Sequence, residues 1–365
     1  MKEVEISQIQ KQLWVLQNVY RDNTAYNIPT VLKIKGIPNF DALHYTINQL
    51  IERHEVLRIY FEEKNNEVFQ TSLNLDQHKI KVDIVEMHES LKENKLPDQI
   101  MEEVHQVFNL LEWPLFRVKL FSFPGRTYVL TIVFHHIIVD LHSKRIFAEE
   151  FSELYNSYCC KYTPHLKNII CDYSEYSKWE EIWLQSDEAE KMLGEWKKFI
   201  PQTPDILEIP ADFSIPRIHN LEGKRKHFTI DKELSLKILR FAEENSVGAF
   251  TVLLTAYAIL LNRLTNQSSI IIGVPLTNRR KPEFKDTFGC FVNILPVLVN
   301  FNDDITGVEL LLQIRQSLLT THRIQEVPFL LINILLRNKA SNSILQAGFT
   351  FEPTMNLSIN SLDSK

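Results

Sequence analysis

Two long apolar segments near the middle of the chain constrain its fold more than any other feature. Leu115–Phe123 (LFRVKLFSF) and Tyr128–His135 (YVLTIVFH) are rich in branched and aromatic residues, and Pro124-Gly125-Arg126-Thr127 separates them. Such residues favour β-strands, and a Pro-Gly pair favours a turn. The pattern therefore predicts a β-hairpin at the centre of the fold.

Segments with apolar residues at helical spacing alternate with segments typical of strands along the rest of the chain. In the first half, the pattern predicts helices over residues 6–22, 41–53, 97–108, 144–158 and 173–199, and strands over residues 30–36, 67–72 and 80–85. In the second half, it predicts strands over residues 225–230, 269–275, 293–301 and 346–352, and helices over residues 232–244, 249–264, 308–323 and 329–336. This alternation predicts an α/β fold with mixed α+β sheets.

A proline-rich stretch separates the two halves. It contains Pro201, Pro204, Pro210 and Pro216. Boundaries between compact units commonly fall in such stretches. We therefore predict an N-terminal lobe at residues 1–200, an inter-lobe linker at residues 201–222 and a C-terminal lobe at residues 223–365.

Composition excludes several classes of protein. Of the 365 residues, 44% are apolar and 24% are charged, values that exclude a disordered tail or a fibrous repeat. The net charge of -6 provides no overall attraction for nucleic acid or an anionic membrane. The four cysteines lack metal-ligand spacing and are interpreted as free thiols in a reducing compartment. We expect a cytoplasmic protein with no nucleic-acid or membrane partner.

The segment Phe134–Ser143 (FHHIIVDLHS) follows directly from the second strand of the hairpin and carries the sharpest chemical signal. Successive strand side chains point to opposite faces, so His135 and His136 cannot both face one site. One histidine should lie in the core and the other in a cleft where the strand ends. It could serve as a base or hydrogen-bond acceptor for an attacking amine or hydroxyl. A packed histidine pair is the structural alternative, and the residues alone leave both open.

Other kinds of catalytic site find less support. His135, His136, Asp140 and His142 lie within eight residues, but the opposed directions of adjacent strand residues argue against a shared metal ion, and we predict none. The chain has no GxSxG nucleophile motif and no glycine-rich phosphate loop. A histidine without a protein nucleophile suggests that the substrate supplies the nucleophile.

Ordered motifs over residues 7–346 resemble those of the condensation domains of nonribosomal peptide synthetases, which are chloramphenicol-acetyltransferase-like acyltransferases. The central match is His135–Leu141, against the family's HHxxxDG. The other matches are Ser7–Leu16, Arg53–Phe61, Tyr173–Trp179, Gly273–Arg279, Phe288–Asn293, Gln325–Phe329 and, in degraded form, Arg337–Gln346.

The resemblance implies a fold and a reaction. The fold is a V-shaped pseudo-dimer of two acetyltransferase-like lobes with a tunnel between them. In the reaction, an acceptor aminoacyl thioester attacks a donor acyl or peptidyl thioester to form an amide bond. Donor and acceptor peptidyl carrier proteins deliver both substrates on phosphopantetheine arms, so no bound cofactor is implied. An adjacent adenylation domain or other synthetase modules are the further partners expected.

The resemblance also implies roles for single residues. His136 matches the family's catalytic histidine, whereas His135 and Asp140 match residues with mainly structural roles. Asp140 is expected to pair with Arg279 across the lobes, since a buried carboxylate needs a partner. Arg58 and Asn293 are further motif residues expected to support the site.

Three departures from the family pattern bear on activity. Leu141 replaces the motif glycine, which permits positive φ and close backbone approach. Gln12 and Ile9 replace an arginine and an alanine of the N-terminal motif. The chain also ends soon after the last motif, which suggests a second lobe that is shortened at its C-terminus.

These departures leave two alternative functions open. The first is a degenerate condensation-like domain that docks carrier proteins or a partner enzyme without catalysis. The second is a related acyltransferase that uses acyl-CoA with an alcohol or amine. The retained His136 favours catalysis, and the Arg53–Phe61 and Phe288–Asn293 motifs favour carrier-bound substrates.

Overall fold

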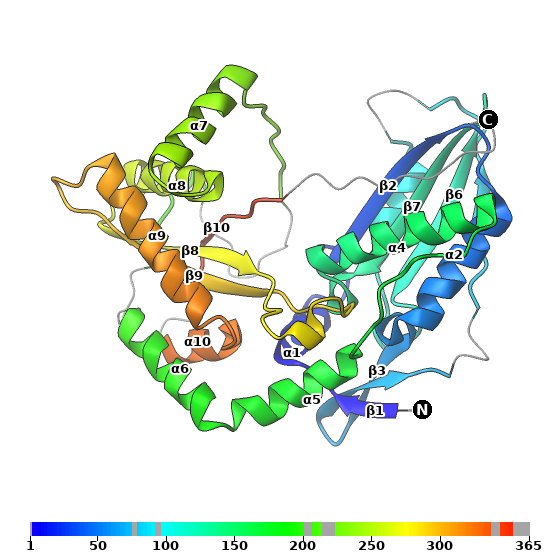
Figure 1. The fold of residues 1–365 in the computed structure, drawn as a ribbon, viewed down its shortest axis with the longest axis horizontal. Helices are drawn as coiled ribbons and strands as arrows, with labels where there is room; N and C mark the ends of the chain where they lie inside the picture. The colour runs from blue at the N-terminus through cyan, green and yellow to red at the C-terminus, as the bar shows by residue number, and fades with distance from the viewer. Residues whose placement is uncertain are drawn as a thin grey trace. The chain divides into compact units, whose positions relative to one another are not determined.

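A computed structural model describes residues 2–74, 79–91, 96–200, 206–213, 223–336 and 344–352. These residues form two compact units (Figure 1). One holds Met1–Ile182 and Arg279–Phe291, and the other holds Trp183–Asn278 and Val292–Pro353. Residues 279–291 thus belong to the first unit, although they follow a long segment of the second. Much of the predicted linker at 201–222 lies outside the described residues, and the predicted lobe boundaries stay a prediction.

The predicted hairpin lies in the main sheet of the first unit, which has the strand order β2-β7-β6-β5. The strands are β2 (Asn27–Lys35), β5 (Asp83–Glu86), β6 (Phe116–Phe123) and β7 (Thr127–His135). Strands β6 and β7 are antiparallel, with Phe116 opposite Phe134. β2 is antiparallel to β7, and β5 is parallel to β6. The hairpin prediction is confirmed, with β7 at the interior of the sheet.

Helices cover the hairpin on both faces. On one face lie α2 (Phe40–Arg53) and α4 (Leu141–Cys160) (Figure 1). The Phe147 ring of α4 packs with its centroid 5.1 Å from that of Phe134. On the other face, α3 (Asp98–Val104) packs its Ile100 against Phe121. Burial on both faces explains why β7 consists almost entirely of apolar residues, and it leaves the end of the strand as the place for polar chemistry.

Shorter elements complete the first unit. β1 (Lys2–Glu5), β4 (Glu67–Ser72) and β3 (Ile59–Lys64) form a small antiparallel sheet in that order. Helix α1 (Gln8–Val19) begins with a capping box between Ser7 and Gln10. The 3-10 turns are η1 (Glu55–Arg58), η3 (His136–Ile138) and η4 (Pro282–Phe284). Helix α5 (Tyr173–Leu184) lies mostly in this unit.

The second unit is built on a sheet with the order β10-β8-β9. Its strands are β8 (Ser269–Leu276), β9 (Asn293–Asn300) and β10 (Ala347–Gly348). Its helices are α6 (Asp187–Phe199), α7 (Lys232–Glu244), α8 (Ala249–Thr265), α9 (Gly307–Arg323) and α10 (Phe329–Leu336). Leu254 of α8 and Ile314 of α9 pack in one cluster with Ile272 and Val297 of the sheet. Each unit therefore has its own core, and the predicted mixed α/β class is confirmed.

Three sequence predictions need correction. Residues 225–230 form no strand, and their side chains are exposed, with Phe228 83% exposed. No described strand pairs with this segment, and alternating apolar residues cannot make a strand without a partner. The predicted helix at 173–199 is two helices, because Ser186 caps the start of α6. The predicted strand at 346–352 is only the short β10.

Among the described residues, no single helix is long and apolar enough to cross a membrane, and α7 and α8 meet that criterion only as a pair bent by 106°.

Candidate active site

The end of β7 separates the two adjacent histidines. His135 is the last strand residue, is 0% exposed, and packs against the ring of Phe108. Its Nδ1 accepts the Ile137 N–H at 3.1 Å, so its Nε2 carries the proton that it donates to Gln17 Oε1 at 3.3 Å. Burial, assisted by His136, lowers the pKa of His135 to about 3. His135 is therefore a neutral core residue, as the strand alternation predicts for one of the pair.

His136 is the partly exposed member of the pair and begins the turn η3. Its Nδ1 lies 2.6 Å from the carbonyl oxygen of Val139. A carbonyl only accepts hydrogen bonds, so we assign the proton to Nδ1 and a lone pair to Nε2. The His136 backbone N–H donates to the Tyr26 carbonyl at 2.8 Å, which fixes the turn. A neutral imidazole with its Nε2 lone pair available is the form that a general base needs.

Asp140 follows this turn and caps helix α4. Its carboxylate accepts the N–H of Ser143 at 2.8 Å and that of Phe291 at 3.0 Å. It also receives two hydrogen bonds from Arg279, at 2.6 Å from Nη1 and 3.1 Å from Nη2. Burial alone would raise the pKa of Asp140, but the Arg279 guanidinium and these backbone donors hold it below its ordinary value. The expected Asp140–Arg279 pair is present, with both side chains 3% exposed.

Arg279 also secures the segment that follows it. Its Nη2 donates to Ser143 Oγ at 2.9 Å and to the carbonyl oxygen of Gly289 at 3.3 Å, and its guanidinium lies 4.0 Å from the ring centroid of Phe291. Ser143 adds two bonds to Gly289, from its hydroxyl to the carbonyl and from the Gly289 N–H to its hydroxyl. Residues 287–291 are thereby fixed against the first turn of α4, beside the histidines.

Aromatic packing completes this arrangement. A Cβ on Gly289 would overlap the ring of Tyr173, so only glycine fits there. The Tyr173 hydroxyl donates to the Cys290 carbonyl at 2.5 Å and lies 2.8 Å from Ser7 Oγ. Gln10 Nε2 donates to the Ile137 carbonyl at 3.3 Å. The N-terminal motif and the Tyr173 motif therefore meet the histidine turn, which explains why separate motifs belong to one site.

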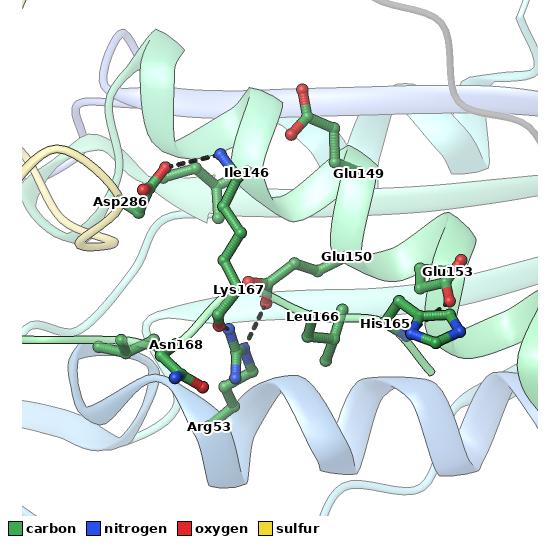
Figure 2. Close-up of a pocket in the computed structure, with 11 residues that line it drawn as sticks. Arg53, Ile146, Glu149, Glu150, Glu153, His165, Leu166, Lys167, Asn168 and Asp286 are labelled. Atoms are coloured by element: carbon green, nitrogen blue, oxygen red, sulfur yellow. Dashed lines mark hydrogen bonds and ion pairs between the residues drawn. The ribbon is translucent and has the colours of Figure 1, made fainter. Parts of the chain in front are cut away.

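A second set of charged contacts connects the end of α2 to α4. Arg53 Nε and His54 Nε2 lie 3.0 Å and 2.7 Å from Glu150 Oε2. Figure 2 shows Arg53 and Glu150 facing each other in a pocket whose lining also includes Lys167 and Asp286. The pocket has a volume of about 160 Å³, and Lys167 Nζ lies 3.0 Å from Asp286 Oδ1. Residues 165–169 form part of its lining, which carries both basic and acidic side chains. The contacts between Arg53, His54 and Glu150 stabilise the packing of α2 against α4, the helix that Asp140 caps.

The remaining predicted site residues lie elsewhere. Arg58 donates to the carbonyls of Ile51 and Glu52, where it caps the end of α2. Asn293 Nδ2 donates to the carbonyls of Gln325 at 2.8 Å and Val327 at 2.7 Å within the second unit. Both residues therefore hold backbone segments in place, and neither forms a hydrogen bond with His136 among the described contacts.

Leu141 is the first residue of α4, and its φ is not positive. The replacement of the motif glycine therefore does not place leucine at a positive φ, because the first residue of a helix has a backbone conformation that any L-amino acid adopts. Its side chain is 37% exposed. Leucine at this position thus costs no backbone strain.

The residues considered for a metal site have separate partners. His135, His136 and Asp140 make the contacts described above, and His142 Nε2 lies 2.9 Å from the Lys285 carbonyl oxygen. Within the part of the chain that the structure describes, no group of three His, Cys, Asp or Glu side chains could hold a metal ion.

Sequence reasoning missed two residues of this site. Ser143 lies two positions beyond the central motif, and its place three residues after Asp140, the residue that caps α4 and accepts the Ser143 N–H, was the available signal. Cys290 lies inside the Phe288–Asn293 motif, and its Sγ is 3.7 Å from His136 Nδ1. No periodicity or spacing predicts that contact, because 154 residues separate the two.

Known proteins resemble this chain in sequence and in structure. The family model described as Condensation domain matches residues 1–364. Gramicidin S synthase 2 of Brevibacillus brevis is 29% identical over 324 residues, which are 89% of this chain and 7% of that protein. Bacitracin synthase 3 of Bacillus licheniformis is 29% identical over 328 residues, which are 89% of this chain and 5% of that protein. The chain therefore spans only a small part of the curated relatives that it matches.

Solved structures share the fold. The first condensation domain of the calcium-dependent antibiotic synthetase, solved with a substrate analogue, has a TM-score of 0.83 at 16% identity and covers 100% of this chain and 83% of that one. The X-domain in its complex with OxyB from teicoplanin biosynthesis has a TM-score of 0.82 at 20% identity and covers 95% of this chain and 77% of that one.

Proposed function

Since the chain belongs to the condensation-domain family, we propose that it forms amide bonds as part of a nonribosomal peptide synthetase. The substrates are a donor acyl or peptidyl thioester and an acceptor aminoacyl thioester, each on a carrier protein. The similarity to gramicidin S synthase 2 supports this assignment. One observation carries it furthest, namely a partly exposed histidine at a strand end whose Nδ1 lies 2.6 Å from the Val139 carbonyl, which leaves Nε2 to act as the acceptor.

In the proposed reaction, the acceptor amine attacks the donor carbonyl, a C–N bond forms and the C–S bond breaks. His136 Nε2 accepts the proton from the amine, and the imidazolium then gives it to the departing phosphopantetheine sulfur. Such general base catalysis typically contributes 10²–10⁴-fold, roughly, to a rate. Aminolysis of a thioester needs neither a protein nucleophile nor a metal ion, so orientation of the two arms supplies much of the rest.

The surrounding residues act by holding His136 in place. Asp140, which follows the histidine turn, forms a buried ion pair with Arg279, which begins the segment 279–291. This ion pair joins the two segments and resists their rearrangement. His135 anchors the strand end as a neutral hydrogen-bond donor to Gln17. Arg58 and Asn293 each bind backbone carbonyls within their own unit.

The partners in this proposal are donor and acceptor peptidyl carrier proteins, with an adenylation domain or further modules of the same synthetase. Substrates arrive on phosphopantetheine arms, and no bound cofactor takes part. The V-shaped pairing of two lobes, the shortened second lobe and the cytoplasmic location stay predictions from the sequence.

A non-catalytic docking role is the second candidate. The solved complex of an X-domain with OxyB favours it, because that protein of the same fold binds a partner enzyme. The hydrogen bond from His136 Nδ1 to Val139 favours catalysis instead, since docking alone needs no such tautomer.

A panel of substrates separates these functions. The chain is mixed with donor and acceptor carrier proteins loaded with aminoacyl groups, and product is read by intact-protein mass spectrometry in a single turnover. We expect a dipeptidyl acceptor carrier. Turnover with free acyl-CoA and no carrier protein would indicate the acyl-CoA alternative, and carrier binding without product would indicate docking.

A further inference from the structure

Cys290 contacts the candidate base from a segment distant in sequence. Its Sγ lies 3.7 Å from His136 Nδ1, and the residue is 0% exposed. The only other hydrogen bond of that ring in the described contacts is the one from Nδ1 to the Val139 carbonyl. A thiol sulfur is a weak hydrogen-bond acceptor, and it can accept the same Nδ1–H as a secondary partner.

The bond to Val139 is short, at 2.6 Å, but it is a local contact. Val139 lies in the same short turn as His136, so this bond orients the ring only relative to its own turn. The outer torsion of a histidine side chain is broad and roughly two-fold, and a flipped ring would exchange Nδ1 with a carbon. A fixed group from another part of the chain is needed to favour one orientation.

Cys290 meets that requirement because its backbone is immobilised on both sides. Tyr173 binds its carbonyl, Ser143 binds Gly289 and Asp140 accepts the Phe291 N–H. The sulfur is therefore presented to the imidazole by a rigid segment. Its complete burial also excludes water, which would compete for Nδ1–H on this side of the ring.

We propose that Cys290 is a positioning residue, whose sulfur favours the ring orientation in which the Nδ1–H of His136 meets the Val139 carbonyl and Nε2 is directed away as the base. A flipped ring would place a C–H group between Sγ and the Val139 carbonyl and lose both polar contacts. The role in catalysis rests on the proposed function, whereas the tautomer itself does not.

The test compares three substitutions. Cys290→Ala removes the sulfur, Cys290→Val fills its space without an acceptor, and Cys290→Ser keeps a polar acceptor. Cys160→Ala, at an exposed cysteine of α4, is the matched control. Each full chain is labelled with ¹⁵N-histidine, and the His136 signals are identified by their loss in His136→Ala. The ¹⁵N shifts report which ring nitrogen carries the proton, and steady-state assays with the loaded carrier proteins give kcat and KM.

We expect wild type, Cys290→Ser and Cys160→Ala to show one Nδ1–H form. Cys290→Ala and Cys290→Val should show a mixture of forms and a kcat lowered about tenfold, with KM for the carriers unchanged, because misorientation affects only the chemical step. Retention of the wild-type tautomer and kcat in Cys290→Val would overturn the proposal, since filling space would then suffice. If Cys290→Val does not fold, unchanged shifts in Cys290→Ala would overturn it equally.

The two proposals fail separately. A tautomer that depends on Cys290 in a chain without condensation activity would support the positioning role and contradict the proposed function. Full condensation activity, together with His136 ¹⁵N shifts that are the same in the wild type and in the Cys290 variants, would support the proposed function and contradict the positioning role.

Discussion

Two buried carboxylates of the first unit lie at helix starts and have opposite ionisation behaviour. Asp140 caps α4, and Glu180 accepts the N–H of Gln8, the first residue of α1, at 2.7 Å. Burial raises the pKa of Glu180 above its ordinary value despite bonds from Gln8 and Tyr176. The pKa of Asp140 is lowered because Arg279 touches it. Helix N-termini and neutral donors thus do not offset the effect of burial on the pKa of a carboxylate here, whereas a contacting guanidinium does.

Removing the cation should produce the largest effect. Arg279→Ala leaves the Asp140 carboxylate buried without its partner, and such a change typically costs about 3–5 kcal/mol of unfolding free energy. Urea denaturation followed by circular dichroism measures it. Arg145→Ala, which breaks an exposed pair with Glu149 on the same helix, is the control and should cost below about 0.5 kcal/mol. Equal losses of unfolding free energy in the two variants would refute the assigned difference between the buried and the exposed ion pair.

The aromatic group between the two carboxylates provides the next test. The Tyr173 ring packs 5.5 Å from that of Tyr176, whose hydroxyl donates to Glu180. Gly289→Ala forces a Cβ into Tyr173 and should destabilise the chain by about 1–3 kcal/mol, as overpacking does. The same denaturation assay checks this, with Gly194→Ala as the control because a Cβ there meets nothing within 4 Å. If Gly289→Ala leaves the unfolding free energy unchanged, the Tyr173 ring is free to move.

A smaller effect concerns pH. Glu180 has a raised folded pKa, so the folded state holds its proton more tightly than the unfolded state. Its stabilising contribution is complete below the ordinary value of 4.5 and is lost as pH rises through the folded pKa. Asp140 acts oppositely, since its contribution is present above 3.8 and is lost as pH falls through the lowered folded pKa.

Glu180→Gln should therefore remove a decline in stability above pH 4.5 while changing the maximum stability little. Unfolding free energies measured by urea at a series of pH values show whether the slope disappears. An unchanged slope in Glu180→Gln would mean that folding does not raise the pKa of Glu180.

The same contrast indicates how far sequence reasoning reached. Asp140 could be predicted because it lies in a motif and precedes a helix, and its pairing with Arg279 followed from the resemblance. The role of Glu180 could not be predicted, because no local pattern indicates that its side chain accepts a hydrogen bond from the backbone of residue 8. The hairpin was predictable from composition and turn chemistry, whereas residues 225–230 were misassigned because a strand depends on a partner that periodicity does not reveal. Contacts across long separations, such as Cys290 with His136, require the fold.

The most direct test of the account is the single-turnover rate of His136→Ala with loaded donor and acceptor carrier proteins. His105→Ala, at an exposed histidine that bonds to its own helix, is the matched control. We expect His136→Ala to fold normally but to lose at least about 100-fold in rate, while His105→Ala retains the wild-type rate. A wild-type rate in His136→Ala would contradict the assignment of His136 as the base.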